Sequence, residues 1–450
     1  MSETNGRLLV VAPSAYTLGG LATWLDYLLP SLTELGWHVT LGLVSGPRHH
    51  QPQRYLEIHP FENIVSIPCD CSTSRGRIKA VRKAVADVRP DIVLTVNIPD
   101  AVRATALERL AGRNVRAVMS CHGIQEDLFA DMRCMADELD AVVCTNELAC
   151  RLAAELGNIE SNRIFHCAYG TKVPEQMPAR PDNRKFTIGY SGRLEQPQKR
   201  IHDLVSIAAR LRDHDRDVQF LIAGSGPEEV AFRASIQRQG LADRFTCLGF
   251  VLPEQLEDRF YKAVDVLLVT SSWETGPIVI WEAMAVGTPV VTSRYTGSGQ
   301  ERLLWHQQNC LMFDIGNSID AASQLKSLCD DSEKYQRIRL RAFETVSSQL
   351  SCRVSSAKWN AVLEQLVRAA PRNSMLQEHS AAEPAGRLDR LLGTRTASAT
   401  RRLLNRLPPD SGPGGEWPHT VVGSTMDEKA FFDLAAKLDR RKESVAESVR

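Results

Sequence analysis

The sequence predicts an α/β protein of two domains, each built around a parallel β-sheet. Short apolar segments rich in Val, Leu and Ile, such as residues 7–12 and 264–269, have the length and composition of buried parallel strands. Segments with the apolar spacing of helices follow them. The alternation restarts after residues 173–184, which contain three prolines and almost no apolar periodicity. We expect this stretch to link the two domains.

Length, charge and cysteine usage narrow the class of protein. A chain of 450 residues can form two or three domains with sizeable cores. The 54 basic and 54 acidic residues balance, so we expect no nucleic-acid partner. The eleven cysteines include Cys69-x-Cys71 but no Cys-x-x-Cys pair, which is poor zinc spacing and favours reduced thiols. We see no signal peptide and no apolar stretch of spanning length, and therefore expect a cytoplasmic location.

The first domain is expected over residues 1–172. Its first strand leads to Gly19-Gly20 and a helix, and Gly20 would let the backbone approach a ligand, although a plain turn uses the same residues. Further strands are expected at 37–44, 91–96, 115–120, 140–145 and 164–168. His122 follows one of them, at the sheet edge where open α/β folds bind ligands. A structural histidine is the alternative.

Residues 75–89 predict a basic amphipathic helix. Its basic residues are Arg75, Arg77, Lys79, Arg82, Lys83 and Arg89. A solvated helix face explains this pattern, and a peripheral contact with a membrane surface is the alternative.

The second domain, expected over residues 185–350, begins with a strand at 186–190. Arg193 follows in the loop, and Lys199 lies near the start of a helix, where a cation opposes the helix dipole. A bound anion shared with Arg193 would relieve that conflict, and so would surface exposure. The strand at 218–223 ends at Gly224, in a turn that lacks the Gly-x-Gly-x-x-Gly pattern of dinucleotide sites.

Two glutamates frame the next strand-loop-helix junction. Glu274 lies in the loop after the strand at 264–269, Pro277 is well placed to open the helix, and Glu282 lies within it. If the intervening segment is mostly helical, the two carboxylates are roughly 12 Å apart, whereas a glycosidase pair needs about 5–9.5 Å. They could instead hold opposite ends of a long ligand whose phosphates lie over the helix N-terminus. The alternative is that Glu274 caps the helix from the loop and that Glu282 is a solvated residue on the helix.

The composition and the hydrophobic pattern change towards the end of the chain. A helix is expected over residues 351–370, packing back on the first domain. Residues 371–450 are expected to be a low-complexity, partly disordered tail with short helices and a flexible Pro- and Gly-rich linker at 408–415. One of these helices, around Phe431 and Phe432, could dock on a partner that the sequence does not identify.

Taken together, residues 7–370 resemble the family 4 (group 1) retaining glycosyltransferases of GT-B architecture. The resemblance rests on Gly189–Leu194 with Lys199, on Ala223–Pro227, and on Glu274 through Val291. It implies two Rossmann-like domains whose parallel sheets face each other across a cleft. The second domain would bind most of a nucleotide-diphosphate sugar.

The resemblance also implies roles for single residues. Arg193 and Lys199 would neutralise the donor diphosphate, Glu282 would bind the ribose hydroxyls, and Glu274 would bind the donor sugar. Gly20 would meet the phosphates, and His122 would contact the sugar. The remaining donor-binding positions would be Gly224, Gly276, Pro277 and Ile278. Gly276 departs from the bulkier apolar residue common there, and Gly297–Glu301 matches the glycine-rich stretch of the family only loosely.

The implied reaction transfers a sugar, with retention, to a saccharide or lipid-linked acceptor. Charge stabilisation of the departing diphosphate is the main task, and same-face attack with no metal and no cofactor is expected. Double displacement through Glu274 is the mechanistic alternative. A sugar-nucleotide isomerase (epimerase) on the same fold and a non-catalytic sugar-nucleotide binding protein are the functional alternatives. The sequence carries no readable code for the sugar, the base or the acceptor.

Overall fold

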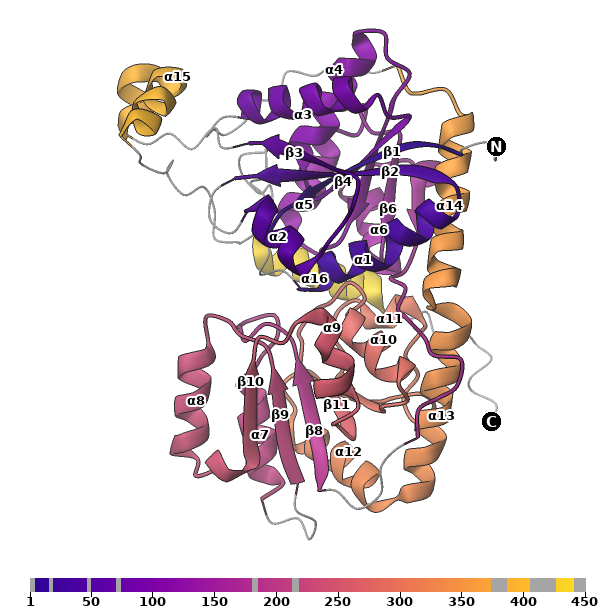
Figure 1. The fold of residues 1–450 in the computed structure, drawn as a ribbon. Coiled ribbons are helices and arrows are strands. Elements are labelled where there is room, and N and C mark those ends of the chain that lie inside the picture. The colour runs from indigo at the N-terminus through magenta and orange to yellow at the C-terminus, as the bar shows by residue number, and fades with distance from the viewer. Residues whose placement is uncertain are drawn as a thin grey trace. The chain divides into compact units, whose positions relative to one another are not determined.

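The computed structural model describes residues 5–15, 19–46, 50–69, 74–179, 185–212, 218–373, 387–404 and 426–440. Residues 180–184 of the expected linker and the stretch at 408–415 lie outside this set. The chain forms two compact units (Figure 1). Unit 1 comprises Met1–Cys167 with Ser356–Asp433, and unit 2 comprises Ala168–Ser355 with Leu434–Arg450.

Unit 1 is built on a seven-stranded parallel sheet. The strands lie in the order β3-β2-β1-β4-β5-β6-β7, so the winding direction reverses between β1 and β4. Leu8 to Ala12 in β1 are fully buried, as expected for a parallel strand covered on both faces. The strands are β1 Gly6–Pro13, β2 Trp37–Ser45, β3 Ile64–Pro68, β4 Ile92–Val96, β5 Arg116–Cys121, β6 Ala141–Cys144 and β7 Ile164–His166.

The first six helices of unit 1 connect these strands. They are α1 Gly19–Glu34, α2 Pro52–Ile58, α3 Ser74–Val88, α4 Pro99–Leu110, α5 Glu126–Cys134 and α6 Glu147–Glu155. Helices α3 and α4 lie side by side (Figure 1).

The expected basic helix is α3, and part of its charge is used inside unit 1. The Nε of Arg77 lies 2.5 Å from the carboxylate of Asp100 in α4, and both side chains are buried. Arg82 forms a second ion pair, 2.8 Å long, with Glu108 of α4. The side chains of Arg75, Lys79 and Lys83 are exposed. They are the basic residues of this helix that remain available to the solvent face.

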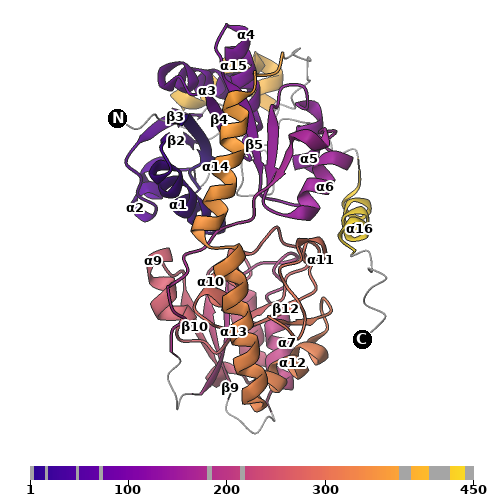
Figure 2. The same cartoon turned by 90° about the vertical axis from the view of Figure 1, so that its right-hand side faces the viewer.

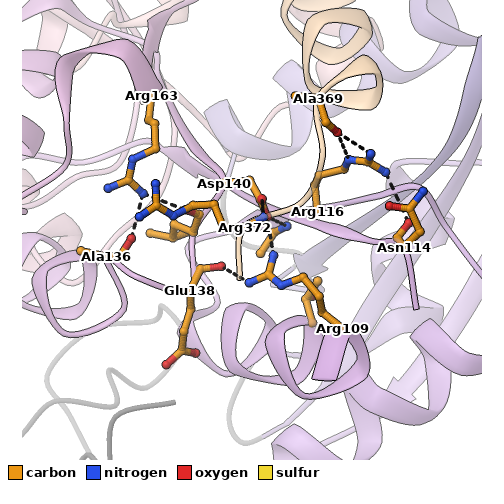
Figure 3. Close-up of polar contacts among 12 residues, drawn as sticks. Arg109, Asn114, Arg116, Ala136, Glu138, Asp140, Arg163, Ala369 and Arg372 are labelled. Atoms are coloured by element: carbon orange, nitrogen blue, oxygen red, sulfur yellow. Dashed lines mark hydrogen bonds and ion pairs between the residues drawn. The ribbon is translucent and has the colours of Figure 1, made fainter. Parts of the chain in front are cut away.

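Helix α14, Cys352–Arg368, packs on unit 1 through its residues beyond 355. Trp359 is fully buried, with its ring centroid 5.6 Å from that of Trp24 in α1. The residues after the helix lie against the amino ends of β5 and β6 (Figure 3). There the guanidinium of Arg116 donates to the carbonyl of Ala369, and the backbone N–H of Arg372 donates to Asp140 over 2.8 Å.

Unit 2 contains a six-stranded parallel sheet. Its order is β10-β9-β8-β11-β12-β13, which places a second reversal between β8 and β11. The prediction of two parallel-sheet α/β domains is therefore confirmed. The strands are β8 Phe186–Ser191, β9 Val218–Ala223, β10 Phe245–Gly249, β11 Val266–Val269, β12 Val290–Ser293 and β13 Leu311–Phe313.

The helices of unit 2 cover this sheet, and α10 and α13 lie side by side (Figure 2). They are α7 Asp203–Arg210, α8 Glu229–Arg238, α9 Pro253–Leu256, α10 Ile278–Ala285, α11 Ser298–Glu301, α12 Ser318–Asp330 and α13 Ser332–Gln349. A π-helical turn, Glu257–Tyr261, follows α9.

Two helices of the expected tail lie within the described residues, and the first is longer than expected. Helix α15, Arg387–Leu403, is interrupted at Gly393, where the backbone φ is 72°. Helix α16 is Glu428–Asp439; its residues through 433 belong to unit 1 and the rest to unit 2. In unit 1 the ring of Phe431 stacks on Phe129 at 6.1 Å. No helix in the described part of the chain is long and apolar enough to span a membrane.

Candidate functional site

The loops after β8 and β9 pack backbone against backbone at the carboxyl edge of the unit 2 sheet. The N–H of Gly192 donates to Ala223 O and that of Leu194 to Ser225 O, each over 3.0 Å. A Cβ added to Gly224 would lie 1.9 Å from the carbonyl oxygen of Gly192. Gly224, which the resemblance assigns to donor binding, therefore has a packing reason to be glycine.

Lys199 and Glu274 meet at this edge, although 75 positions separate them. The Nζ of Lys199 lies 2.6 Å from Oε1 of Glu274, and Ser271 donates its hydroxyl to the same oxygen over 2.6 Å. Glu274 is only 6% exposed, so this carboxylate is held by a cation and a hydroxyl in a largely dry environment. The conflict expected between Lys199 and the helix dipole is thus relieved within the chain, by a carboxylate.

Hydrogen bonds to backbone carbonyl groups hold the loop of Lys199 against the loop of Glu274. The N–H of Ser272 donates to Gln198 O over 2.7 Å, and the amide of Gln198 donates to Trp273 O over 3.1 Å. The hydroxyl of Thr270 donates to Lys199 O over 2.8 Å. These contacts fix both ends of the Lys199–Glu274 pair.

A second loop supports Glu274 from the side of β12. The N–H of Glu274 donates to Thr296 O over 3.1 Å, and the N–H of Thr296 donates to Ser272 O over 2.9 Å. Tyr295 of this loop is buried, and its burial together with the charge of Glu274 raises its pKa. The Glu274 loop is therefore hydrogen-bonded to the Lys199 loop and to the loop that follows β12.

Arg193 is paired with a different carboxylate. Its Nε lies 2.8 Å from Glu195, and its side chain is 43% exposed. Both residues lie near the buried hydroxyl of Tyr190, which donates to Arg193 O over 2.8 Å. Burial raises the pKa of Tyr190, and the charges of Glu274 and Glu195 add to that effect. The two ion pairs thus share Tyr190 as a neighbour.

The expected turn before the second glutamate is present. Gly276 has a φ of 93°, which an L side chain rarely adopts, so the departure from the bulkier residue of the family has a backbone cause. Pro277 takes the N-cap position, and α10 begins at Ile278, one residue later than the sequence indicates. No side chain caps this helix start, and the N–H of Ile280 donates to Pro277 O over 2.9 Å. An anion at this end of the helix would meet the N–H groups of Ile278 and Val279.

Glu282 has its own partner, Tyr261. The Tyr261 hydroxyl, on the π-helical turn, donates to Oε2 of Glu282 over 2.6 Å. Tyr261 is almost fully buried, so it fixes the orientation of the carboxylate on α10. Sequence reasoning missed both Tyr261 and Ser271, because neither forms part of a recognisable pattern with its glutamate.

The two candidates in unit 1 differ in how well they are fixed. His122 lies after β5 with its ring 4.3 Å from that of Trp24, and its Nε2 is 2.8 Å from Ser120 Oγ. The Ser120 hydroxyl also lies 3.1 Å from Thr95 O, so it links His122 to the end of β4. Burial lowers the pKa of His122 to about 3, so the ring is neutral near pH 7. Gly20 lies in the exposed first turn of α1.

Among the described residues, no group of three or more His, Cys, Asp or Glu side chains is arranged to hold a metal ion.

Comparison with known proteins agrees with this geometry. Residues 174–345, which include both glutamates and both cations, match the family profile described as "Glycosyl transferases group 1". This matched segment coincides with most of unit 2, and it contains Arg193, Lys199, Glu274 and Glu282.

Curated relatives carry related names. Over 200 residues the chain is 33% identical to a 2-deoxystreptamine glucosyltransferase of Streptomyces kanamyceticus, an alignment that covers 42% of this chain and 50% of the relative. Over 288 residues it is 21% identical to the N-acetyl-alpha-D-glucosaminyl L-malate synthase of Bacillus anthracis, covering 60% and 73%. The chain thus spans half the length of the first of these relatives.

Solved structures share the fold. Anabaena Alr3699/HepE, solved in complex with UDP and glucose, is similar with a TM-score of 0.66 and 20% identity, covering 80% of this chain and 100% of that one. Sucrose-phosphate synthase from Thermosynechococcus elongatus gives a TM-score of 0.65 and 18% identity, covering 80% and 98%. These similarities show that the chain has the GT-B fold.

Proposed function

We propose that the protein is a retaining, metal-independent glycosyltransferase. It transfers a sugar from a nucleotide-diphosphate sugar to a saccharide or lipid-linked acceptor. The observation that carries the proposal is the Lys199–Glu274–Ser271 cluster, which lies at the carboxyl edge of the unit 2 sheet beside the uncapped start of α10. Solved proteins of the same fold that bind UDP and UDP-glucose support the donor class.

The chemistry follows from the charges. When the bond between sugar and diphosphate breaks, negative charge grows on the diphosphate, and Lys199, Arg193 and the N–H groups at Ile278 stabilise it. Glu274 contacts the donor sugar, while Glu282, oriented by Tyr261, binds the ribose. The departing phosphate oxygen accepts the proton of the acceptor, so attack occurs on the same face of the sugar.

Each glutamate is engaged with a different partner, Glu274 with Lys199 and Glu282 with Tyr261. This arrangement suits separate contacts along one donor molecule better than a joint acid–nucleophile pair. If a glycosyl adduct could be trapped on Glu274, the reaction would proceed by double displacement and not by same-face attack.

The exposed Arg75, Lys79 and Lys83 of α3 support a further component of the proposal. These three cations allow a cytoplasmic protein to make peripheral contact with an anionic membrane surface, where lipid-linked acceptors are located.

Donor binding is tested by a thermal-shift screen over nucleoside diphosphates and nucleotide-sugars. A ligand at 100 times its dissociation constant stabilises the folded chain by about 2.7 kcal/mol. Because Arg193 makes a charge-assisted contact worth about 1.5–3 kcal/mol, Arg193→Ala should weaken diphosphate binding by roughly ten- to a hundredfold. Product analysis with and without an acceptor then separates transfer from isomerisation.

Arg233→Ala is a matched control. Arg233 also forms an exposed ion pair with a glutamate in unit 2, but on helix α8 (Arg233 Nη2 to Glu229, 2.9 Å). It should leave diphosphate binding unchanged. Equal binding by the Arg193 variant and the unmodified chain would refute the diphosphate assignment.

A further inference from the structure

The last residue of α16 docks on the segment that follows β12, at the start of the short helix α11. Oδ2 of Asp439 accepts hydrogen bonds from the backbone N–H groups of Gly297, over 2.8 Å, and Gly299, over 3.1 Å. Its Oδ1 accepts from the N–H of Gln300 over 3.0 Å. Three backbone donors therefore converge on one carboxylate, which comes from a distant part of the chain but belongs to the same unit.

The fit extends beyond the carboxylate. The side-chain amide of Gln300 donates to the carbonyl oxygens of Asp439, over 3.3 Å, and Arg440, over 2.6 Å. A Cβ added to Gly299 would lie 2.1 Å from the carbonyl oxygen of Asp439, so only glycine permits this approach. Asp439 and Gln300 are 8% and 7% exposed. The contact is thus a closely packed interface.

The charges explain why the contact forms at this end of the helix. A carboxylate in the last turn opposes the helix dipole, and the last carbonyl groups of a helix need hydrogen-bond donors. The loop supplies N–H groups to the carboxylate and the Gln300 amide to the carbonyls. Gly297, with a φ of 110°, gives the loop the backbone shape that turns these groups toward Asp439.

The same loop supports the candidate site. Thr296, one residue before Gly297, pairs with Ser272 and Glu274 through the two backbone hydrogen bonds described above. Tyr295 precedes Thr296 in the chain. Burial raises its pKa, and the nearby charges of Glu274 and Asp439 raise it further. The short segment 295–300 therefore contacts Asp439 on one side and the Glu274 loop on the other.

We propose that Asp439 is a positioning residue, which holds segment 295–300 in the shape that places Glu274 against the donor sugar. This inference rests on the proposed function of Glu274. It assigns to the C-terminal helix a direct role in the unit 2 site.

The test compares the full-length variants Asp439→Ala and Asp439→Asn with Asp433→Asn. Asp433 is an exposed carboxylate on the same helix, so its variant controls for the loss of a charge from α16. Hydrogen–deuterium exchange is followed in peptides covering 295–301 and 271–276. In the Asp439 variants both peptides should exchange faster, because the N–H groups of Thr296 and Glu274 share one ladder. Asp433→Asn should change neither.

Activity provides the second readout. With a nucleotide-sugar that the unmodified chain turns over, kcat of the Asp439 variants should fall by roughly ten- to a hundredfold, as expected for a slightly misplaced contact group. Affinity for the nucleoside diphosphate alone should be retained, because Glu274 contacts the sugar. If Asp439 only stabilised the fold, its replacement would lower both kcat and the affinity for the nucleoside diphosphate.

Three results would overturn the inference: unchanged exchange in 271–276, unchanged kcat, or an increase in kcat, which would mark an inhibitory contact. A chain that turns over no nucleotide-sugar would refute the proposed function instead. Faster exchange in 271–276 would still establish the coupling of Asp439 to the Glu274 loop.

Discussion

Replacing Gly224 by alanine tests the packing of the loops that carry the candidate site. The new methyl group would lie 1.9 Å from the carbonyl oxygen of Gly192 and 3.0 Å from its carbonyl carbon. The two loops would have to separate by more than about 1 Å to reach van der Waals contact. The hydrogen bonds from Gly192 to Ala223 and from Leu194 to Ser225, each 3.0 Å long, would weaken or break.

The cost has two parts. Overpacking costs about 1–3 kcal/mol, and a side chain at the Gly224 φ of 142° adds about 1–3 kcal/mol of backbone strain. A unit of this size loses about 2–4 °C of Tm per kcal/mol, so the Tm of unit 2 should fall by at least about 4 °C. Because Arg193 lies on the displaced loop, nucleoside-diphosphate affinity should fall as well.

Gly240→Ala is the control for this experiment. Gly240 also has a positive φ, 64°, but an added Cβ would meet no atom within 4 Å. This variant should cost only about 1–2 kcal/mol of backbone strain and leave ligand affinity unchanged. Differential scanning calorimetry of the full chain measures the Tm of both variants. Equal Tm losses in the two variants would refute the packing argument.

Two further predictions concern unit 1. Because burial lowers the pKa of His122 to about 3, the unfolded chain binds more protons than the folded chain between about pH 3 and 6.5. The free energy of unfolding therefore falls as pH is lowered through this range, and His122→Gln should make that loss smaller in denaturation curves; an identical pH dependence would contradict the burial argument. On α3, each basic residue near an anionic surface contributes about 1 kcal/mol of binding free energy. Replacing Arg75, Lys79 and Lys83 by glutamine should therefore lower the affinity for anionic vesicles, measured by co-sedimentation, by roughly a hundredfold. Zwitterionic vesicles are the control. Unchanged sedimentation would remove the membrane component of the proposed function.

The sheets were the most predictable part of the structure. Central strands such as β1 and β11 contain short continuous apolar runs, Leu8–Ala12 and Val266–Val269, and these runs are buried. Strand β3, Ile64–Pro68, was not predicted, because an edge strand needs no such run and its residues are mostly exposed or half-buried. Composition therefore identified the central strands, and among the edge strands of the unit 1 sheet it also identified β7, Ile164–His166.

The candidate site was predictable only in part. Local patterns placed Glu274 and Glu282 around one helix start, and Arg193 and Lys199 near another. The resemblance then gave each of them a role toward a donor. The ion pairs that neutralise both cations were not predicted, since they depend on loop geometry across 75 positions in one case. Nothing in the local sequence connects Asp439 with Gly297, because a carboxylate bound by backbone N–H groups leaves no pattern of side chains.

The pairing of both cations has a consequence for how a ligand approaches. Arg193 with Glu195, and Lys199 with Glu274, are neutral when seen from beyond the Debye length of about 8 Å at physiological salt. These four groups therefore exert little long-range attraction on a passing anion. Selection among phosphorylated molecules in solution is left to short-range fit, after the ligand has already arrived.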